Sequence, residues 1–142
     1  MTTVAPGWSA LLALQQAAHA TMQALAAELA GLDLTAAEIN ALAILADGRS
    51  RSVSELGRAA GARPTTLTSV LDRLERRGHV TRGPRPGDRR GVLIELTGSG
   101  RQAAATIRHA ITGIEQRALA SLPAETTAAL RTALQALTEV SR

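Results

Sequence analysis

The chain has no cysteine, no lysine and a single aromatic residue, Trp8. Without cysteine it can form no disulfide, no thiolate metal site and no thiol redox switch. It also lacks the run of about 18 apolar residues that a transmembrane helix needs. Its N-terminus shows no basic segment followed by an apolar core, the pattern of a secretory signal. We therefore expect a cytoplasmic protein without a membrane partner.

The positive charge is concentrated in the middle of the sequence. All 16 basic residues are arginine, and the stretch from Arg49 to Arg90 holds 11 of them against 4 acidic residues, a balance of +7. The remainder has 5 arginines against 8 acidic residues, a balance of −3. A basic centre between neutral or acidic flanks is typical of a DNA-binding lobe attached to helices that do not bind DNA. The alternative is an ordinary solvated surface in an arginine-biased composition.

Residues 52–78 show the pattern of two helices joined by a turn. Ser52 and Glu55 have the spacing of a capping box that starts a helix, and Gly61 suits the turn after it. Pro64 suits the first turn of the second helix, which Gly78 ends. The apolar residues expected on the buried sides are Leu56, Ala59 and Ala60 in the first helix, and Leu67, Val70, Leu71 and Leu74 in the second.

The other face of the second helix carries short hydroxyl groups and long cations near its N-terminal end. Such side chains can contact base edges in the major groove and the phosphates beside it. A helix-turn-helix that presents them is therefore a candidate DNA reader. The candidates for this contact are Arg63, Thr65, Thr66, Thr68, Ser69 and Arg73.

A β-hairpin is expected after the two helices. Residues 79–82 and 92–96 are β-prone runs, and residues 83–91 between them are rich in glycine and proline. Arg85, Arg89 and Arg90 lie at or near the tip of such a hairpin, where they are candidates for contact with the flanking minor groove or its phosphates. Asp88 stands beside two of these arginines, so we expect it to stabilise the hairpin rather than act as a general base.

At these residues the sequence resembles the winged helix-turn-helix of the MarR family of bacterial transcription regulators. The resemblance rests on residues 74–78, LERRG, at the end of the recognition helix. It also rests on Asp88-Arg89-Arg90 followed by Leu96-Thr97 across the wing. The sequence departs from the usual pattern at Arg63, where a Ser or Thr N-cap is commoner, and at His79, usually an aliphatic position.

The predicted fold is mainly α, with a small β-hairpin wing, in one domain that covers residues 1–142. Apolar stripes indicate further helices before and after the winged helix-turn-helix. The resemblance implies that the N- and C-terminal helices of two subunits interlock as a dimerisation region; the alternative is a monomeric helical domain. The predicted parts are residues 35–97 for the DNA-binding lobe, and residues 8–34 and 98–142 for the dimerisation helices.

An enzyme is the rival class, and the sequence gives it no support. It contains no Gly-rich phosphate loop, no HExxH and no GxSxG pattern. His19, His79 and His109 lie far apart without metal-ligand spacing, so we expect no metal site and no cofactor. His19 and His109 could still meet in a dimer to bind zinc or to sense pH.

The function that these patterns and the resemblance favour is a homodimeric transcription regulator, most often a repressor in this family. Its partners are then double-stranded DNA with a pseudo-palindromic operator, and a second copy of itself. The resemblance also implies a small, often phenolic or otherwise lipophilic anion as effector, bound between the dimer helices and the DNA-binding lobe. A cleft lined by Leu, Ile and Ala, with an Arg or His at its edge, could take such an acid. The absence of cysteine excludes the peroxide sensing of some relatives. The alternative function is an effector-independent winged helix that bridges DNA or docks a protein.

Overall fold

The computed structural model describes residues 7–85 and 88–141, with the side chains at positions 85, 88–90 and 141 outside the description. The predicted class is confirmed, since helices dominate and the strands form one small sheet. The elements in chain order are α1 (Ala10–Glu28), η1 (Ala30–Leu32), α2 (Ala36–Leu45), β1 (Arg51–Ser52), α3 (Val53–Ala60), α4 (Pro64–Arg76), β2 (Val80–Arg85), β3 (Asp88–Leu96), α5 (Gly98–Leu119), α6 (Ala124–Thr138) and η2 (Glu139–Ser141).

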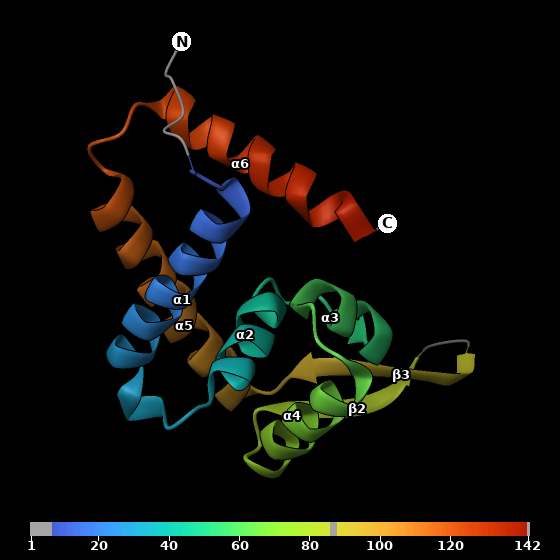
Figure 1. The fold of residues 1–142 in the computed structure, drawn as a ribbon. Helices are drawn as coiled ribbons and strands as arrows, with labels where there is room; N and C mark the ends of the chain where they lie inside the picture. The colour runs from blue at the N-terminus through green and yellow to red at the C-terminus, as the bar shows by residue number, and fades with distance from the viewer. Residues whose placement is uncertain (1–6, 86–87, 142) are drawn as a thin grey trace.

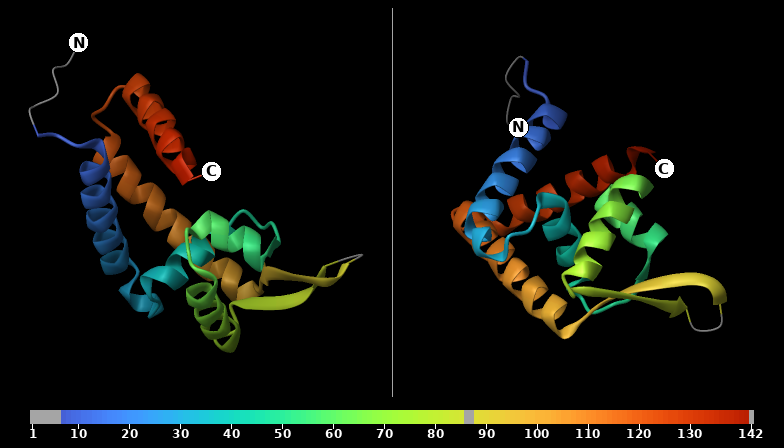
Figure 2. Two further views of the ribbon diagram at one scale, coloured as in Figure 1. Left: turned by 45° about the vertical axis from the view of Figure 1, so that its right-hand side comes forward. Right: turned by 90° about the horizontal axis from the view of Figure 1, so that it is seen from below.

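The helices α2, α3 and α4 and the sheet form one lobe, from which the β2–β3 hairpin projects (Figure 1). The helix α5 starts beside the sheet, packs on α2, and continues alongside α1. Both further views show α1 and the far half of α5 extending away from the lobe as an arm (Figure 2). The long helix α5 therefore links the hairpin lobe to the arm.

Side-chain caps set where several helices begin, as the sequence predicts. The hydroxyl oxygen of Thr35 accepts from the Glu38 N–H at 3.2 Å at the start of α2, and that of Ser52 accepts from the Glu55 N–H at 3.1 Å at the start of α3. Each bond satisfies one of the N–H groups that have no partner within the helix. The helix α3 ends at Gly61, whose φ of 63° lies in the left-handed region.

The sheet has the order β1-β3-β2, with antiparallel pairing throughout. The strands β2 and β3 extend further than predicted, into the segment expected to be an irregular loop. Gly83 pairs with Leu93 and Pro84 with Val92. Pro84 is tolerated because β2 is an edge strand, where a missing N–H breaks no ladder bond on the open side. The short strand β1 was not predicted, since two residues give no readable alternation.

One hydrophobic core runs through the lobe into the arm. Leu56 of α3 and Ile107 of α5 have no exposed surface, and Leu25 of α1 continues the same cluster. The apolar side predicted for α4 is confirmed, because all four of its residues are buried. Ala59 was predicted to be buried and is exposed. The buried turn of α3 is centred on Leu56 alone, and a methyl group at position 59 is small enough to stay in solvent.

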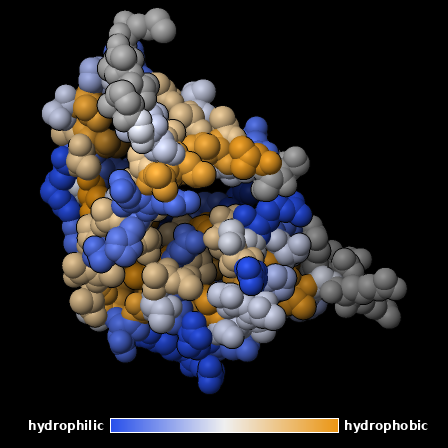
Figure 3. All heavy atoms as spheres, in the orientation of Figure 1, coloured by the Kyte–Doolittle hydropathy of each residue, from blue (hydrophilic) through white to orange (hydrophobic). Residues whose placement is uncertain are grey.

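The helix α6 stands apart from this core. None of its residues is buried, although Leu130 and Leu134 are large and apolar. Figure 3 shows hydrophobic surface along α6, separated from the lobe below it by a hollow. Leu11 and Leu12 at the start of α1 are also exposed. The outer ends of the arm therefore present an apolar surface that one copy of the chain does not cover.

Candidate nucleic-acid interface

The outer face of α4 is a row of hydroxyl groups held in place by the buried inner face. Leu71 and Leu74 on the inner side have no exposed surface. The hydroxyl of Thr68 donates to the carbonyl oxygen of Pro64 at 2.8 Å, so its oxygen is left as an acceptor. The exposed side chains that the sequence singled out, and that the fold brings together here, are Thr65, Thr66, Thr68 and Ser69.

The start of α4 lacks a side-chain cap. Arg63 has the extended N-cap conformation, with φ −69° and ψ 149°, but makes no side-chain cap bond within the described residues. Its carbonyl oxygen accepts the Leu67 N–H at 2.9 Å, and Pro64 occupies the first helical position. The Arg63 side chain is exposed beside the hydroxyl row. Contact between this side chain and DNA stays a prediction.

Two arginines of α4 have different surroundings. The Nε atom of Arg73 lies 3.1 Å from Oε1 of the buried Glu38, so this cation is held toward α2. Arg76 is exposed, and its Nε donates to the carbonyl oxygen of Asp72 at 3.4 Å. Arg76 was not among the predicted DNA contacts. It follows Ser69 by seven residues, a spacing that returns to the same helix face.

Ion pairs fasten the wing to the recognition helix. Arg82 of β2 lies 2.5 Å from a carboxylate oxygen of Asp72 and 3.3 Å from one of Glu75. Both acidic residues belong to α4, so these ion pairs join β2 to α4. None of these three residues was among the predicted site residues, although Glu75 is part of the LERRG motif. Their contact could not be predicted, because residue spacing in the sequence does not give the distance between a helix and the strand that follows it.

The distal part of the wing is described only in its backbone. Arg85 ends β2 and pairs in register with Asp88 of β3, beyond an irregularity at Pro84/Arg85. The side chains of Arg85, Asp88, Arg89 and Arg90 lie outside the described residues. Their predicted roles in DNA contact and in stabilising the wing therefore stay predictions.

The joint between α4, the wing and α5 is centred on Thr97. Its hydroxyl donates to the Gly78 carbonyl oxygen at 2.5 Å and accepts the Gly100 N–H at 3.0 Å, and its own N–H donates to the His79 carbonyl oxygen at 3.0 Å. The His79 Nδ1 atom lies 2.9 Å from the Ser99 hydroxyl. Burial, and then the charge of Arg77, lower the pKa of His79. Both effects favour the neutral form of this histidine, which stands where the family pattern has an aliphatic residue.

A cavity of about 290 Å³ lies where α1, α2 and α5 meet. Its polar lining groups are Thr21, Asn40 and Glu115, whereas the sequence-based expectation was an Arg or His at the edge of such a cleft. His19 and His109 are exposed on α1 and α5, and neither a histidine nor an arginine lines this cavity. The apolar lining residues are Met22, Leu25, Ile39, Ala43, Ile111 and Ile114.

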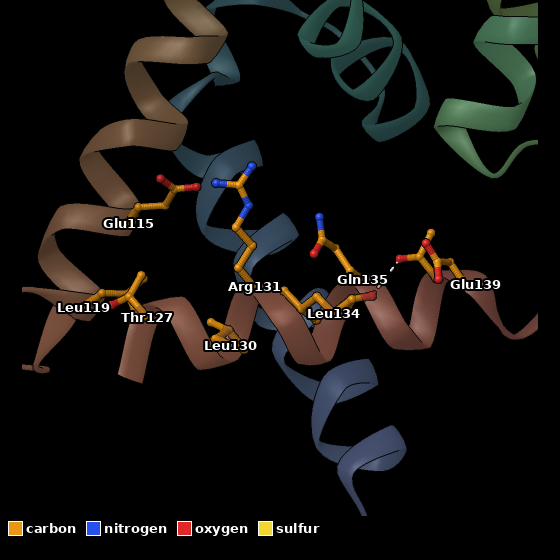
Figure 4. A pocket seen from close by; sticks show the side chains of 9 residues that line it. Glu115, Leu119, Thr127, Leu130, Arg131, Leu134, Gln135 and Glu139 are labelled. Carbon is orange, nitrogen blue, oxygen red and sulfur yellow. Dashed lines mark hydrogen bonds between the residues drawn. The ribbon is translucent and has the colours of Figure 1, made fainter. Parts of the chain in front are cut away.

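A second hollow, of about 520 Å³, separates the end of α5 from α6. Figure 4 shows Glu115 of α5 and Arg131 of α6 pointing toward one another across it, with Leu130 and Leu134 along α6. This hollow is wide and belongs to the apolar end of the arm.

Within residues 7–85 and 88–141 no group of three His, Cys, Asp or Glu side chains could hold a metal ion. Nor does any described helix have the length and hydropathy to cross a membrane.

Comparison with known proteins identifies this lobe. Residues 34–92 match the model of the MarR family. The winged-helix lobe of the chain belongs to the MarR family. Over 72 residues the chain is 39% identical to the multiple antibiotic resistance protein MarR of Escherichia coli (strain K12), covering 51% of this chain and 50% of that protein. The chain thus spans about half the length of this curated relative.

Two solved structures extend the likeness along the chain. The crystal structure of NadR in complex with 4-hydroxyphenylacetate has a TM-score of 0.85 at 25% identity and covers 99% of both chains. The crystal structure of a mutant MarR from E. coli, complexed with operator DNA, has a TM-score of 0.73 at 28% identity, covering 87% of this chain and 89% of that one. MarR-family proteins are transcription regulators and not enzymes, which agrees with the class inferred from the sequence.

Proposed function

We propose that the chain is a homodimeric, sequence-specific DNA-binding regulator that acts as a repressor. The observation that carries the proposal is the exposed row of hydroxyl groups on α4, which is backed by a fully buried face and tied to the wing through Arg82. A helix held in this way can enter a major groove without losing its orientation. The net charge of +7 from Arg49 to Arg90 supplies attraction to phosphates.

The proposed dimer rests on the apolar ends of the arm. Leu11 and Leu14 of α1 face Leu134 and Leu137 of α6 across a hollow that this copy leaves unfilled. Val140, in the following η2, is 79% exposed at the rim of the same hollow. A second copy related by a two-fold axis would cover these side chains and would place two α4 helices for a pseudo-palindromic site.

Sedimentation velocity tests the dimer. We expect one dimeric species at micromolar concentration for the intact chain, and dissociation when Leu130 and Leu134 are both changed to Glu. Thr132→Glu, on the opposite side of α6, is the matched control and should leave the dimer intact. A monomeric wild type at this concentration would remove the homodimer from the proposal.

DNA selection tests the main function. The wild-type protein is used to select duplexes from a randomised library, and footprinting then maps the selected site. We expect an inverted repeat whose half-sites are centred about one helical turn apart, with tighter binding than to a scrambled duplex of equal composition. Selection of no common sequence would contradict specific recognition. It would favour the alternative of an effector-independent module that bridges DNA or docks a protein.

We further propose that the cavity between α1, α2 and α5 holds the effector. NadR has been solved with 4-hydroxyphenylacetate, a phenolic acid, and that chain shares this fold. The present cavity contains a carboxylate, Glu115, and an amide, Asn40, but no cation among its lining residues. These groups suit a small neutral phenol, whose hydroxyl can donate to Glu115, better than they suit an anion.

A binding titration separates these ligand classes. A neutral phenol should weaken the affinity of the selected duplex, a benzoate of equal size should do so less, and Glu115→Gln should reduce the difference. An unchanged DNA affinity with both classes would favour regulation without an effector.

A further inference from the structure

Glu38 is a buried carboxylate between α2 and the recognition helix. Only 3% of the residue is exposed, and among the described residues no other charged side chain is buried to this degree. Its Oε1 accepts from the Thr35 hydroxyl at 3.0 Å and from Arg73 Nε at 3.1 Å. Thr35 and Glu38 start α2, whereas Arg73 lies on α4, so the contact joins two helices across 35 residues of sequence.

The other carboxylate oxygen faces a second arginine, the C-cap residue of α4. Glu38 Oε2 is buried and has no hydrogen-bond partner within the described residues, and Arg77 NH1 lies 3.8 Å from it. Arg77 itself donates from NH1 to the Asp33 carbonyl oxygen, and from NH2 to that of Leu32 at 2.9 Å. These carbonyls belong to the link between α1 and α2. One guanidinium therefore spans from the buried carboxylate to the point where the arm joins the lobe.

Burying a charged carboxylate between two helices costs desolvation free energy. Two apolar side chains of similar volume would often stabilise such a contact as well or better. An ion pair with fixed hydrogen bonds differs from an apolar contact because it holds one geometry and penalises small displacements. Arg77, the C-cap residue of α4, follows Arg73 by one helical turn, so both point to the same side, toward α2 and the link. The charges are thus arranged to fix how α4 lies against the start of α2.

We infer that Glu38 is a positioning residue that fixes the recognition helix through Arg73 and Arg77, and that Arg73 serves this link instead of contacting DNA. The inference rests on the proposed function, because it concerns the orientation of a DNA-reading helix. It reassigns Arg73, which the sequence pattern placed among the DNA contacts. Glu38 also follows the cap of α2 and precedes Ile39 and Asn40, which line the cavity, so the same turn of α2 borders both features.

A double-mutant cycle in urea unfolding tests the link itself. The variants are Glu38→Gln, which keeps the volume of the side chain, Arg73→Met, and the two combined. We expect each single change to raise the equilibrium constant for unfolding about tenfold, and the double change to raise it by about the same factor as one of them. Arg76→Met, at an exposed position on the same helix, is the control and should leave unfolding unchanged. Additive effects of the two substitutions would contradict the coupling.

DNA binding tests whether the link positions the helix or only stabilises the fold. The probes are the duplex selected by the wild type and a scrambled duplex, under conditions where every variant is folded. Glu38→Gln and Arg73→Met should each weaken binding to the selected duplex about tenfold and leave the scrambled duplex unchanged. Neither should alter the slope of log K against log salt.

Other outcomes would overturn this role. A slope that falls by about 0.9 in Arg73→Met would show that a phosphate is no longer neutralised and would return Arg73 to the DNA interface. Unchanged affinity for the selected duplex in both folded variants would leave Glu38 with a stabilising role alone. A wild type that binds neither duplex would defeat the proposed function and the positioning role together. The unfolding cycle would still report whether Glu38 and Arg73 are coupled.

Discussion

A Cβ atom at Gly100 would lie 1.9 Å from the carbonyl oxygen of His79. Gly100 is buried in the first turn of α5, and His79 lies between the recognition helix and the wing. The backbone of α5 therefore packs directly against the backbone at the start of the wing, with no room for a side chain between them. Thr97 bonds to the same carbonyl from the position before α5. The arm and the DNA-reading lobe thus meet at a contact that only glycine permits.

Replacing Gly100 by Ala should therefore destabilise the protein by at least about 2 kcal/mol, because the clash is with backbone and cannot be relieved by a rotamer change. The control is Gly98→Ala in the same turn, where the added methyl would meet only the Arg101 guanidinium at 3.7 Å. That change should alter the free energy of unfolding by less than about 1 kcal/mol. Urea unfolding of both variants measures this, and equal stabilities would contradict the close approach.

Much of the lobe was predictable because its signals are local. Ser52 was identified as a helix cap from Glu55, three positions later, and the inner face of α4 from a spacing of three and four residues. The order of the elements followed from the same signals. The exposed hydroxyl row on α4 then followed as the other side of one helix.

Features that depend on packing between distant segments were not predictable. The pairing of Glu38 with Arg73 depends on how α2 lies against α4, which residue spacing along the chain does not give. The extension of β2 through Gly83 and Pro84 depended on β3 as a partner, which overrides a weak strand propensity. The lining of the cavity depended on three helices from both halves of the chain, so its carboxylate could not be foreseen.

Substitutions on the buried face of α4 should lower stability, and substitutions on its exposed face should weaken DNA recognition. Leu71 has no exposed surface, so Leu71→Ala should cost about 2–5 kcal/mol through reduced burial and the cavity left behind. Ser69 is exposed, so Ser69→Ala should change the free energy of unfolding by less than about 0.5 kcal/mol, while it weakens binding to the selected duplex. Thermal melts and duplex titrations measure the two effects. A larger decrease in stability for Ser69→Ala would contradict the observed orientation of the helix.

The stability of the protein should depend on the protonation of His79. Burial lowers the pKa of His79 below its ordinary value of 6.5, so the folded protein binds this proton more weakly than the unfolded chain does. The contribution of neutral His79 to the free energy of unfolding is therefore complete above about pH 6.5. It declines as the pH falls from there through the lowered pKa of the folded state. His79→Leu should remove this part of the pH dependence. Urea midpoints at about pH 7.5 and about pH 5.5 measure it, and an equal decline in wild type and variant would assign it to other groups.

The wing arginines should contribute affinity rather than sequence discrimination. Arg89 and Arg90 follow Asp88 in the backbone of β3, close to the distal end of the hairpin that projects from the lobe (Figure 2). Long cations there are expected to neutralise phosphates or to enter a narrow minor groove, and such contacts carry little base information. Changing both to Ala should weaken binding to the selected and the scrambled duplex alike.

The salt dependence of binding distinguishes the wing from α4. The double arginine variant should flatten the slope of log K against log salt by about 0.9 for each phosphate that it no longer neutralises. Thr65→Ala or Ser69→Ala should leave that slope unchanged, because neither side chain carries a charge, and should relax the preference at single base pairs by about 1–3 kcal/mol. A salt titration of both duplexes with these variants makes the comparison. A slope that stays at the wild-type value in the double arginine variant would remove the wing from the DNA interface and leave recognition to α4 alone.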